Sequence, residues 1–60
     1  MTLFEKFKDK TLFVTVQNGT LFPTYKGIIL SQIGNFIEFE TENNTIWLNC
    51  NFIIKFIEIE

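Results

Sequence analysis

The residues that could carry covalent or acid–base chemistry are few in this sequence and do not form a catalytic set. The chain has no His and no Arg, one Ser at position 31 and one Cys at position 50. A Ser or Cys nucleophile needs a neighbouring base or a cationic environment. For Cys50 the nearest cation along the chain is Lys55. We therefore interpret Cys50 as a small apolar core residue, and we predict that the protein is not an enzyme and uses no cofactor.

Carboxylates are the most numerous chemically capable side chains. Glu38, Glu40 and Glu42 alternate along one face of a predicted strand, and Glu58 and Glu60 lie near the end of the sequence. Such groups can bind divalent metals or transfer protons. On a strand face they more commonly keep the surface solvated and oppose edge-to-edge aggregation. We favour the solvated face and predict no metal site.

The same acidic face could also dock a basic partner. Residues 1–30 hold four Lys and two acids, whereas residues 31–60 hold one Lys and five acids. A polarity of this kind orients two proteins as they meet. We therefore take Glu38, Glu40, Glu42 and the neighbouring Phe36 as the candidate partner-binding residues.

Lysines next to aromatic side chains offer a further possibility, because single-stranded nucleic acids bind to such combinations. The candidates are Lys6, Lys8, Lys10 and Lys26, with Phe13 or Tyr25 for stacking. The chain nevertheless has a net charge of −2 and a pI near 4.9. This acidity disfavours nucleic acid as the partner.

Length and composition limit the class of protein. Sixty residues make a single domain, 1–60, and a hydrophobic content of 47% excludes intrinsic disorder. A lone Cys allows no intramolecular disulfide, and the N-terminus has no signal-peptide pattern. No apolar run exceeds three residues, so we expect no membrane span and a cytoplasmic location. Abundant Ile, Phe, Asn and Lys, which have AT-rich codons, indicate a low-GC bacterium or its phage or plasmid.

A short helix is expected at the start of the chain. Thr2 and Glu5 have the spacing of a capping box. Leu3, Phe4 and Phe7 then form one apolar stripe. We predict a helix over 3–9, lying on a hydrophobic surface made by the rest of the chain, because an isolated helix of this length does not persist in water.

From residue 11 the hydrophobic period changes to two, which predicts strands. The expected spans are 11–17, 25–33, 36–42, 45–50 and 52–60, with turns at Asn18-Gly19, Gly34-Asn35 and Asn43-Asn44. The inward sets are expected to be Leu12, Val14 and Val16, then Ile37, Phe39 and Thr41, then Ile46, Leu48 and Cys50. Gly27 inside the second strand predicts a bulge or a sharp bend.

A helix followed by five short strands predicts an all-β fold, a small five-stranded antiparallel barrel whose interior is filled by side chains. The pattern resembles the Sm-like (LSm/Hfq) version of the SH3-like barrel. The resemblance spans nearly the whole chain, through the segments Val14–Gly19, Tyr25–Leu30, Asn35–Phe39 and Ile53–Ile57. It implies the family's fold and rings assembled through strand edges, but it does not extend to RNA binding, which is the family's activity. Of the family's RNA-contacting residues Asn35 is retained, but the loop Asp is absent and Asn49-Cys50-Asn51 replaces the family's cationic loop.

The last strand is apolar on both faces. By alternation Ile53, Ile57 and Ile59 share one face, and Phe52, Ile54 and Phe56 the other. A terminal strand of a small sheet is usually half solvated, so a second subunit is expected to cover one face. We predict a homodimer or higher oligomer, with Glu58 and Glu60 limiting further pairing. The predicted self-association residues are Trp47, Phe52, Ile54, Phe56, Ile57 and Ile59.

The expected function is therefore non-catalytic binding of a host protein by a homo-oligomer. Small phage-encoded inhibitors of bacterial defence, such as those acting against CRISPR or Hachiman systems, are similar in size, acidity and composition. A phage- or mobile-element-encoded inhibitor is our first hypothesis. The alternative is an Sm-like RNA-binding regulatory protein.

Overall fold

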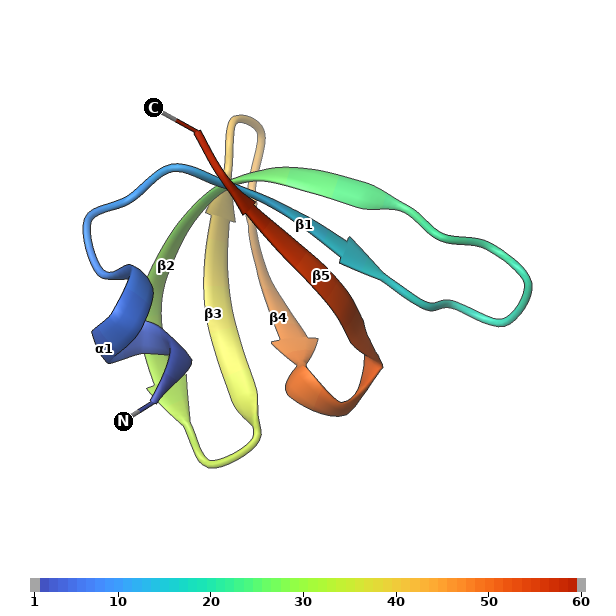
Figure 1. The fold of residues 1–60 in the computed structure, drawn as a ribbon, viewed down its shortest axis with the longest axis horizontal. Helices are drawn as coiled ribbons and strands as arrows, with labels where there is room; N and C mark the ends of the chain where they lie inside the picture. The colour runs from blue at the N-terminus through green and yellow to red at the C-terminus, as the bar shows by residue number, and fades with distance from the viewer. Residues whose placement is uncertain (1, 60) are drawn as a thin grey trace.

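The computed structural model describes residues 2–59, which form one short α-helix, one 3-10 helix and five β-strands (Figure 1). In chain order these elements are α1 (Leu3–Phe7), β1 (Leu12–Val16), β2 (Thr24–Ile33), β3 (Phe36–Thr41), β4 (Thr45–Asn49), η1 (Cys50–Phe52) and β5 (Ile53–Glu58). The predicted order of a helix followed by five strands is confirmed. Glu60, which we expected to end the last strand and to limit pairing, lies outside the described residues.

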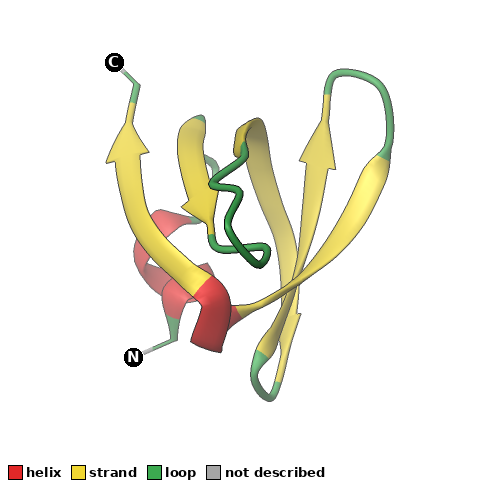
Figure 2. Ribbon diagram, turned by 90° about the vertical axis from the view of Figure 1, so that its right-hand side faces the viewer, coloured by secondary structure: helices red, strands yellow, loops and turns green. Residues whose placement is uncertain are grey.

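The strands form one antiparallel sheet in the order β4-β3-β2-β1-β5 over residues 2–59. The predicted all-β antiparallel class is therefore confirmed. The hydrogen-bonded sheet of residues 2–59 is open, because β4 and β5 are its two edges and η1 joins them along the chain. Figure 2 shows the strands curving as they cross one another, so that the sheet has an inner and an outer side.

The inner side of the sheet carries the hydrophobic core. Its fully buried apolar side chains come from β1, β2 and β3 and are Leu12, Val14, Val16, Ile29, Ile37 and Phe39. Half-buried side chains surround them, including Ile46, Leu48 and Cys50 from β4 and η1. The inward sets predicted by alternation are thus confirmed for β1 and β4, and in β3 for Ile37 and Phe39.

The N-terminal helix is capped as predicted but is shorter than expected. The Glu5 amide donates to the Thr2 hydroxyl at 3.1 Å, and the Glu5 carboxylate accepts from the Thr2 amide at 3.3 Å. The helix ends at Phe7 rather than at residue 9, because Lys8 leaves the helical conformation with a ψ of 135° and Asp9 has a φ of 63°. That left-handed residue turns the chain toward β1. The helix is fixed to the sheet by Phe7, whose ring stacks on Phe56 at 5.2 Å.

The faces of β5 differ from those expected by alternation. Thr15 pairs with Lys55, but Val16 pairs with Ile53, so Ile54 is an extra residue in β5. A bulge of this kind shifts the side-chain alternation by one. Ile53 therefore shares the core side with Phe56, and Ile54 shares the exposed side with Ile57. The predicted grouping of Ile57 with Ile53 is wrong for this reason.

Gly27 marks a close approach of two strands. A Cβ atom at this position would overlap the backbone carbonyl of Glu40 and would lie 3.1 Å from the Phe39 ring. The predicted bulge itself occurs further along β2, where the register shifts between Ile29 and Ser31. Gly27 thus lets β2 cross close to β3, and the bulge lies three residues later.

We predict that Gly27→Ala destabilises the fold by roughly 2–3 kcal/mol, because overpacking against fixed backbone has this order of cost. The measurement is urea denaturation at a fixed protein concentration. Gly34→Ala is the matched control, since Gly34 has a φ of 55° but open space around its Cα. The Gly34→Ala control should lower stability only by the cost of a left-handed backbone at Ala, which is roughly 1–2 kcal/mol. Equal stability of the Gly27→Ala variant and the wild type would show that β2 has room to shift.

Candidate functional site

The most prominent surface feature is uncovered apolar area. Among residues 2–59, six apolar side chains are fully buried and nine large ones are exposed. The exposed set is Leu21, Phe22, Leu30, Ile33, Phe36, Trp47, Phe52, Ile54 and Ile57. Single exposed hydrophobic residues are normal, but a contiguous apolar patch marks an association surface. The candidate site is therefore sought where these residues gather.

Two of them lie on the outer side of β5, and Phe52 lies on η1 just before that strand. Ile54, Ile57 and Phe52 expose 52%, 48% and 56% of their surface. Ile57 pairs with Phe13 of β1, which is half-buried on the same outer side. The outer face of the β1–β5 pair thus exposes Ile54 and Ile57 beside Lys55, which pairs with Thr15 on the same side.

The other two β5-region residues of the predicted set are less available. Phe56 is half-buried against the core and stacks on Phe7. Ile59 is half-buried, and its amide donates to the Thr11 carbonyl at 2.9 Å. These two residues hold α1 and the end of the chain to the sheet. We therefore assign the outer surface to Phe52, Ile54 and Ile57.

Trp47 borders an uncharged groove beside β4, which both polar and apolar side chains line. Trp47 is 49% exposed and lies opposite Glu38 of β3 in the register. The groove has a volume of about 210 Å³ and separates β4 and η1 from the start of β2 and the preceding loop. Its lining residues are Val16, Gln17, Asn18, Pro23, Tyr25, Trp47, Leu48, Asn49 and Phe52. No charged side chain of the described residues lines it.

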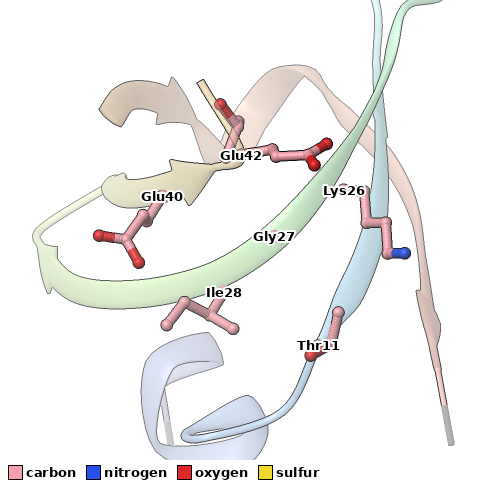
Figure 3. Close-up of a pocket in the computed structure, with 7 residues that line it drawn as sticks. Thr11, Lys26, Gly27, Ile28, Glu40 and Glu42 are labelled. Carbon is pink, nitrogen blue, oxygen red and sulfur yellow. The ribbon is translucent and has the colours of Figure 1, made fainter. Parts of the chain in front are cut away.

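The acidic residues occupy a different place. Glu38 is half-buried and accepts a hydrogen bond from the Ser31 hydroxyl at 3.0 Å. Glu40 and Glu42 are exposed and line a second groove, of about 320 Å³, together with Lys26 (Figure 3). Phe36, predicted with them, lies at the start of β3 and is 49% exposed.

This second groove has mixed charge and no metal-binding geometry. Figure 3 shows the Lys26 side chain directed away from Glu42. Its Nζ atom lies instead 6.0 Å from the centroid of the Phe13 ring. Within residues 2–59 no three Asp, Glu, Cys or His residues are grouped so that they could hold a metal ion. The groove can therefore offer a partner two solvated carboxylates.

The predicted basic patch is divided among separate contacts. Lys10 forms a salt bridge with Glu58 at 3.3 Å. Lys6 and Lys8 lie 5.6 and 6.0 Å from the ring centroids of Phe7 and Phe4, and Lys26 lies over Phe13. Tyr25, the other expected stacking residue, packs against the core. The four lysines thus have four different neighbours.

Cys50 has the structural role that we expected. Its side chain packs against the core, and its amide donates to the Asn35 carbonyl at 2.8 Å. Burial raises the pKa of the Cys50 thiol, and a hydrogen bond to its backbone opposes this only in part. A raised pKa leaves less of the reactive thiolate at neutral pH.

Four exposed apolar residues, Leu21, Phe22, Leu30 and Ile33, were not identified by the sequence analysis. Leu21 and Phe22, in the connection between β1 and β2, expose 66% and 58% of their surface. The available signal was an apolar pair placed between the Asn18-Gly19 turn and Pro23, outside any alternating strand.

Within residues 2–59, no helix combines the length and the apolar content needed to cross a bilayer.

No protein-family model, curated protein or solved structure matches the chain. The candidate site is therefore defined by its geometry alone. It consists of the apolar outer face at Phe52, Ile54 and Ile57, the adjoining groove at Trp47, and a separate acidic surface at Glu40 and Glu42.

We predict that Cys50 reacts with iodoacetamide at pH 8 more slowly than the same residue in an unstructured peptide of its local sequence. The raised pKa lowers the thiolate fraction, and core packing limits access. The rate, followed by mass spectrometry, should rise with pH and should reach the peptide value in denaturing urea. Equal rates for the folded and unfolded protein would contradict a buried thiol.

Proposed function

We propose that this protein is a non-catalytic protein-binding module that acts as a homo-oligomer. The observation that carries the proposal is the half-exposed apolar surface of Phe52, Ile54 and Ile57. Complete burial of one such side chain contributes roughly 1.5–3 kcal/mol, so covering the exposed half of each contributes about 1 kcal/mol. Three such contributions are comparable with the stability of a 60-residue domain.

We also infer that the curved sheet is a barrel of the SH3-like, Sm-like type. The short N-terminal helix, the antiparallel strands and the ten-residue, bent β2 support this inference. The two open edges of the sheet also support self-association, because β4 and β5 leave backbone groups available to another strand. Lys55, exposed on β5, limits uncontrolled pairing.

The partner that we propose is a basic surface of a host protein, docked by Glu40 and Glu42 with Glu38 and Phe36 beside them. The exposure of the first two carboxylates supports this choice. The small size, acidity and AT-rich composition of the chain favour a phage or mobile element as its source, and a bacterial defence enzyme in the cytoplasm as its target. Defence enzymes that handle nucleic acid present basic surfaces of this kind.

The alternative is an Sm-like RNA-binding regulatory protein. Its support is the resemblance in sequence pattern, including Asn35. RNA binding requires cations that face the phosphates. Here Lys10 is paired with Glu58, and Lys26 lies over the Phe13 ring. Because the lysines are dispersed, we rank RNA binding below protein binding.

We predict that Ile57→Glu shifts the protein from an oligomer toward a monomer at micromolar concentration. A carboxylate on the apolar outer face would have to be desolvated in the contact, which costs several kcal/mol. The measurement is light scattering coupled to size-exclusion chromatography.

Lys55→Gln is the control for this experiment, because it changes a neighbouring exposed residue of β5 without adding a carboxylate. The control should retain the oligomer, and circular dichroism should show the same sheet content in both variants. A wild-type protein that is monomeric at these concentrations would remove the basis of the proposal.

We predict that the double variant Glu40→Gln/Glu42→Gln loses a basic host protein that the wild type captures at about 50 mM salt. Capture should also weaken at high salt, because exposed charge pairs are screened. The variant Asp9→Asn/Glu58→Gln removes the same charge elsewhere and should retain the partner. Equal capture by both variants, measured by quantitative mass spectrometry of the bound fraction, would show that net charge rather than this surface is recognised.

A further inference from the structure

The connection between β1 and β2 is an ordered projection, which we call the arm and define as residues 17–23. Asn18 and Leu21 exchange two backbone hydrogen bonds of 2.9 and 3.0 Å, and Gly19 takes a φ of 65° at the turn. At the base, the Gln17 amide donates to the Phe52 carbonyl at 2.8 Å. Figure 1 shows the arm extending well beyond the rest of the sheet.

The arm carries two large apolar side chains that residues 2–59 leave uncovered. Leu21 and Phe22 expose 66% and 58% of their surface. They follow a hydrogen-bonded turn and precede Pro23, whose ring restricts the backbone. A preorganised apolar segment loses little conformational entropy when it binds. The arm is therefore suited to insertion into an uncharged recess.

Such a recess lies beside the base of the arm, in the groove at Trp47. Trp47 and Phe52 line it from the side of β4 and η1. Pro23 at the base of the arm and Tyr25 of β2 line the opposite side. Its volume of about 210 Å³ can receive apolar side chains from one short segment. Recognition sites commonly combine aromatic walls with a few amides, which here are Gln17, Asn18 and Asn49.

The absence of charged residues on the arm and in the groove indicates what kind of segment can bind there. The arm has no charged residue and neither has the groove lining, although 20% of the chain is charged. The centres of protein interfaces are depleted in charge and enriched in Trp, Tyr and Phe. A nucleic acid or an anionic membrane requires cations, and a basic peptide requires carboxylates. The occupant that fits is an uncharged apolar segment, and a second copy of this chain supplies one.

We propose that Leu21 and Phe22 of one copy dock in the Trp47 groove of a second copy, whose own arm docks in return. Arm and groove are neighbours on one end of the molecule, so a two-fold axis makes the two contacts equivalent. A stable interface requires on the order of 1,000 Å² in total, or about 500 Å² from each copy. That is roughly one eighth of the 4262 Å² surface of one copy. This inference rests on the proposed self-association and adds the arm and its groove to the outer face of β5 as surfaces that produce it.

The test uses the full chain and compares Leu21→Ser/Phe22→Ser with the wild type by sedimentation equilibrium. The double variant should raise the dissociation constant of the dimer at least tenfold. Leu21→Ser alone should weaken the dimer more than Ile33→Ser, which is the matched control because Ile33 is 67% exposed at the end of β2. Circular dichroism should show that all these variants remain folded.

Trp47 provides an independent signal, because it is the single Trp of the chain and lines the groove. Its emission should shift to longer wavelength when the wild type is diluted and the groove becomes hydrated. The arm variant should show the long-wavelength emission at every concentration. Mixing the arm variant with Trp47→Ala should restore part of the association, since the pair retains one intact arm and one intact groove.

The outcomes separate this inference from the proposed function. If the wild type dimerises and Ile57→Glu disrupts the dimer while Leu21→Ser/Phe22→Ser does not, the arm inference is wrong and the proposed function stands. If the wild type is monomeric at all concentrations, both fail. Arm-dependent binding to phosphatidylcholine vesicles, with unchanged self-association, would also overturn the arm inference by identifying a different occupant.

Discussion

The small size of the hydrophobic core determines how much apolar surface this protein leaves exposed. A chain of 60 residues buries only about 60% of the surface that it exposes when unfolded. Here a single sheet encloses Leu12, Val14, Ile37 and Phe39 on its inner side. Nearly half of the sequence is apolar, so many large side chains remain outside, on the outer sheet face, on η1 and on the arm. The same shortage of enclosed volume that makes the fold marginal also leaves exposed the apolar surfaces through which we propose that copies associate.

Two backbone irregularities decide where this apolar surface lies. The close crossing at Gly27, followed by the register shift between Ile29 and Ser31, bends β2 around the core. The bulge at Ile54 places Ile53 and Phe56 inside, and it leaves Ile54 and Ile57 on the outer side. Phe56 then anchors α1 through Phe7. Without the bulge, strict alternation would put a different pair of side chains outside.

The exposed surfaces differ in chemistry, and this difference supports a separate binding role for each surface. The face at Phe52, Ile54 and Ile57 is apolar and the groove at Trp47 is uncharged, which suits contact between copies. Glu40 and Glu42 line a separate groove of mixed charge, which suits a solvated, salt-sensitive contact with another protein. An oligomer would present several copies of the acidic surface at once. Multivalent display of this kind strengthens binding without any new contact.

The sequence by itself determined the order of elements, the capping box at Thr2 and Glu5, the turns, and the inward residues of β1 and β4, because these depend on local periodicity and hydrogen bonding. It also placed Trp47 on the outward side of its strand, but it put Ile54 and Ile57 on opposite faces of β5. Only the tertiary structure decided the open sheet, the bulge at Ile54, the stacking that occupies Phe56, and the projection of Leu21 and Phe22. These features depend on which strands become neighbours and in what register. That pairing is set by contacts between residues far apart in the chain, which local periodicity does not record.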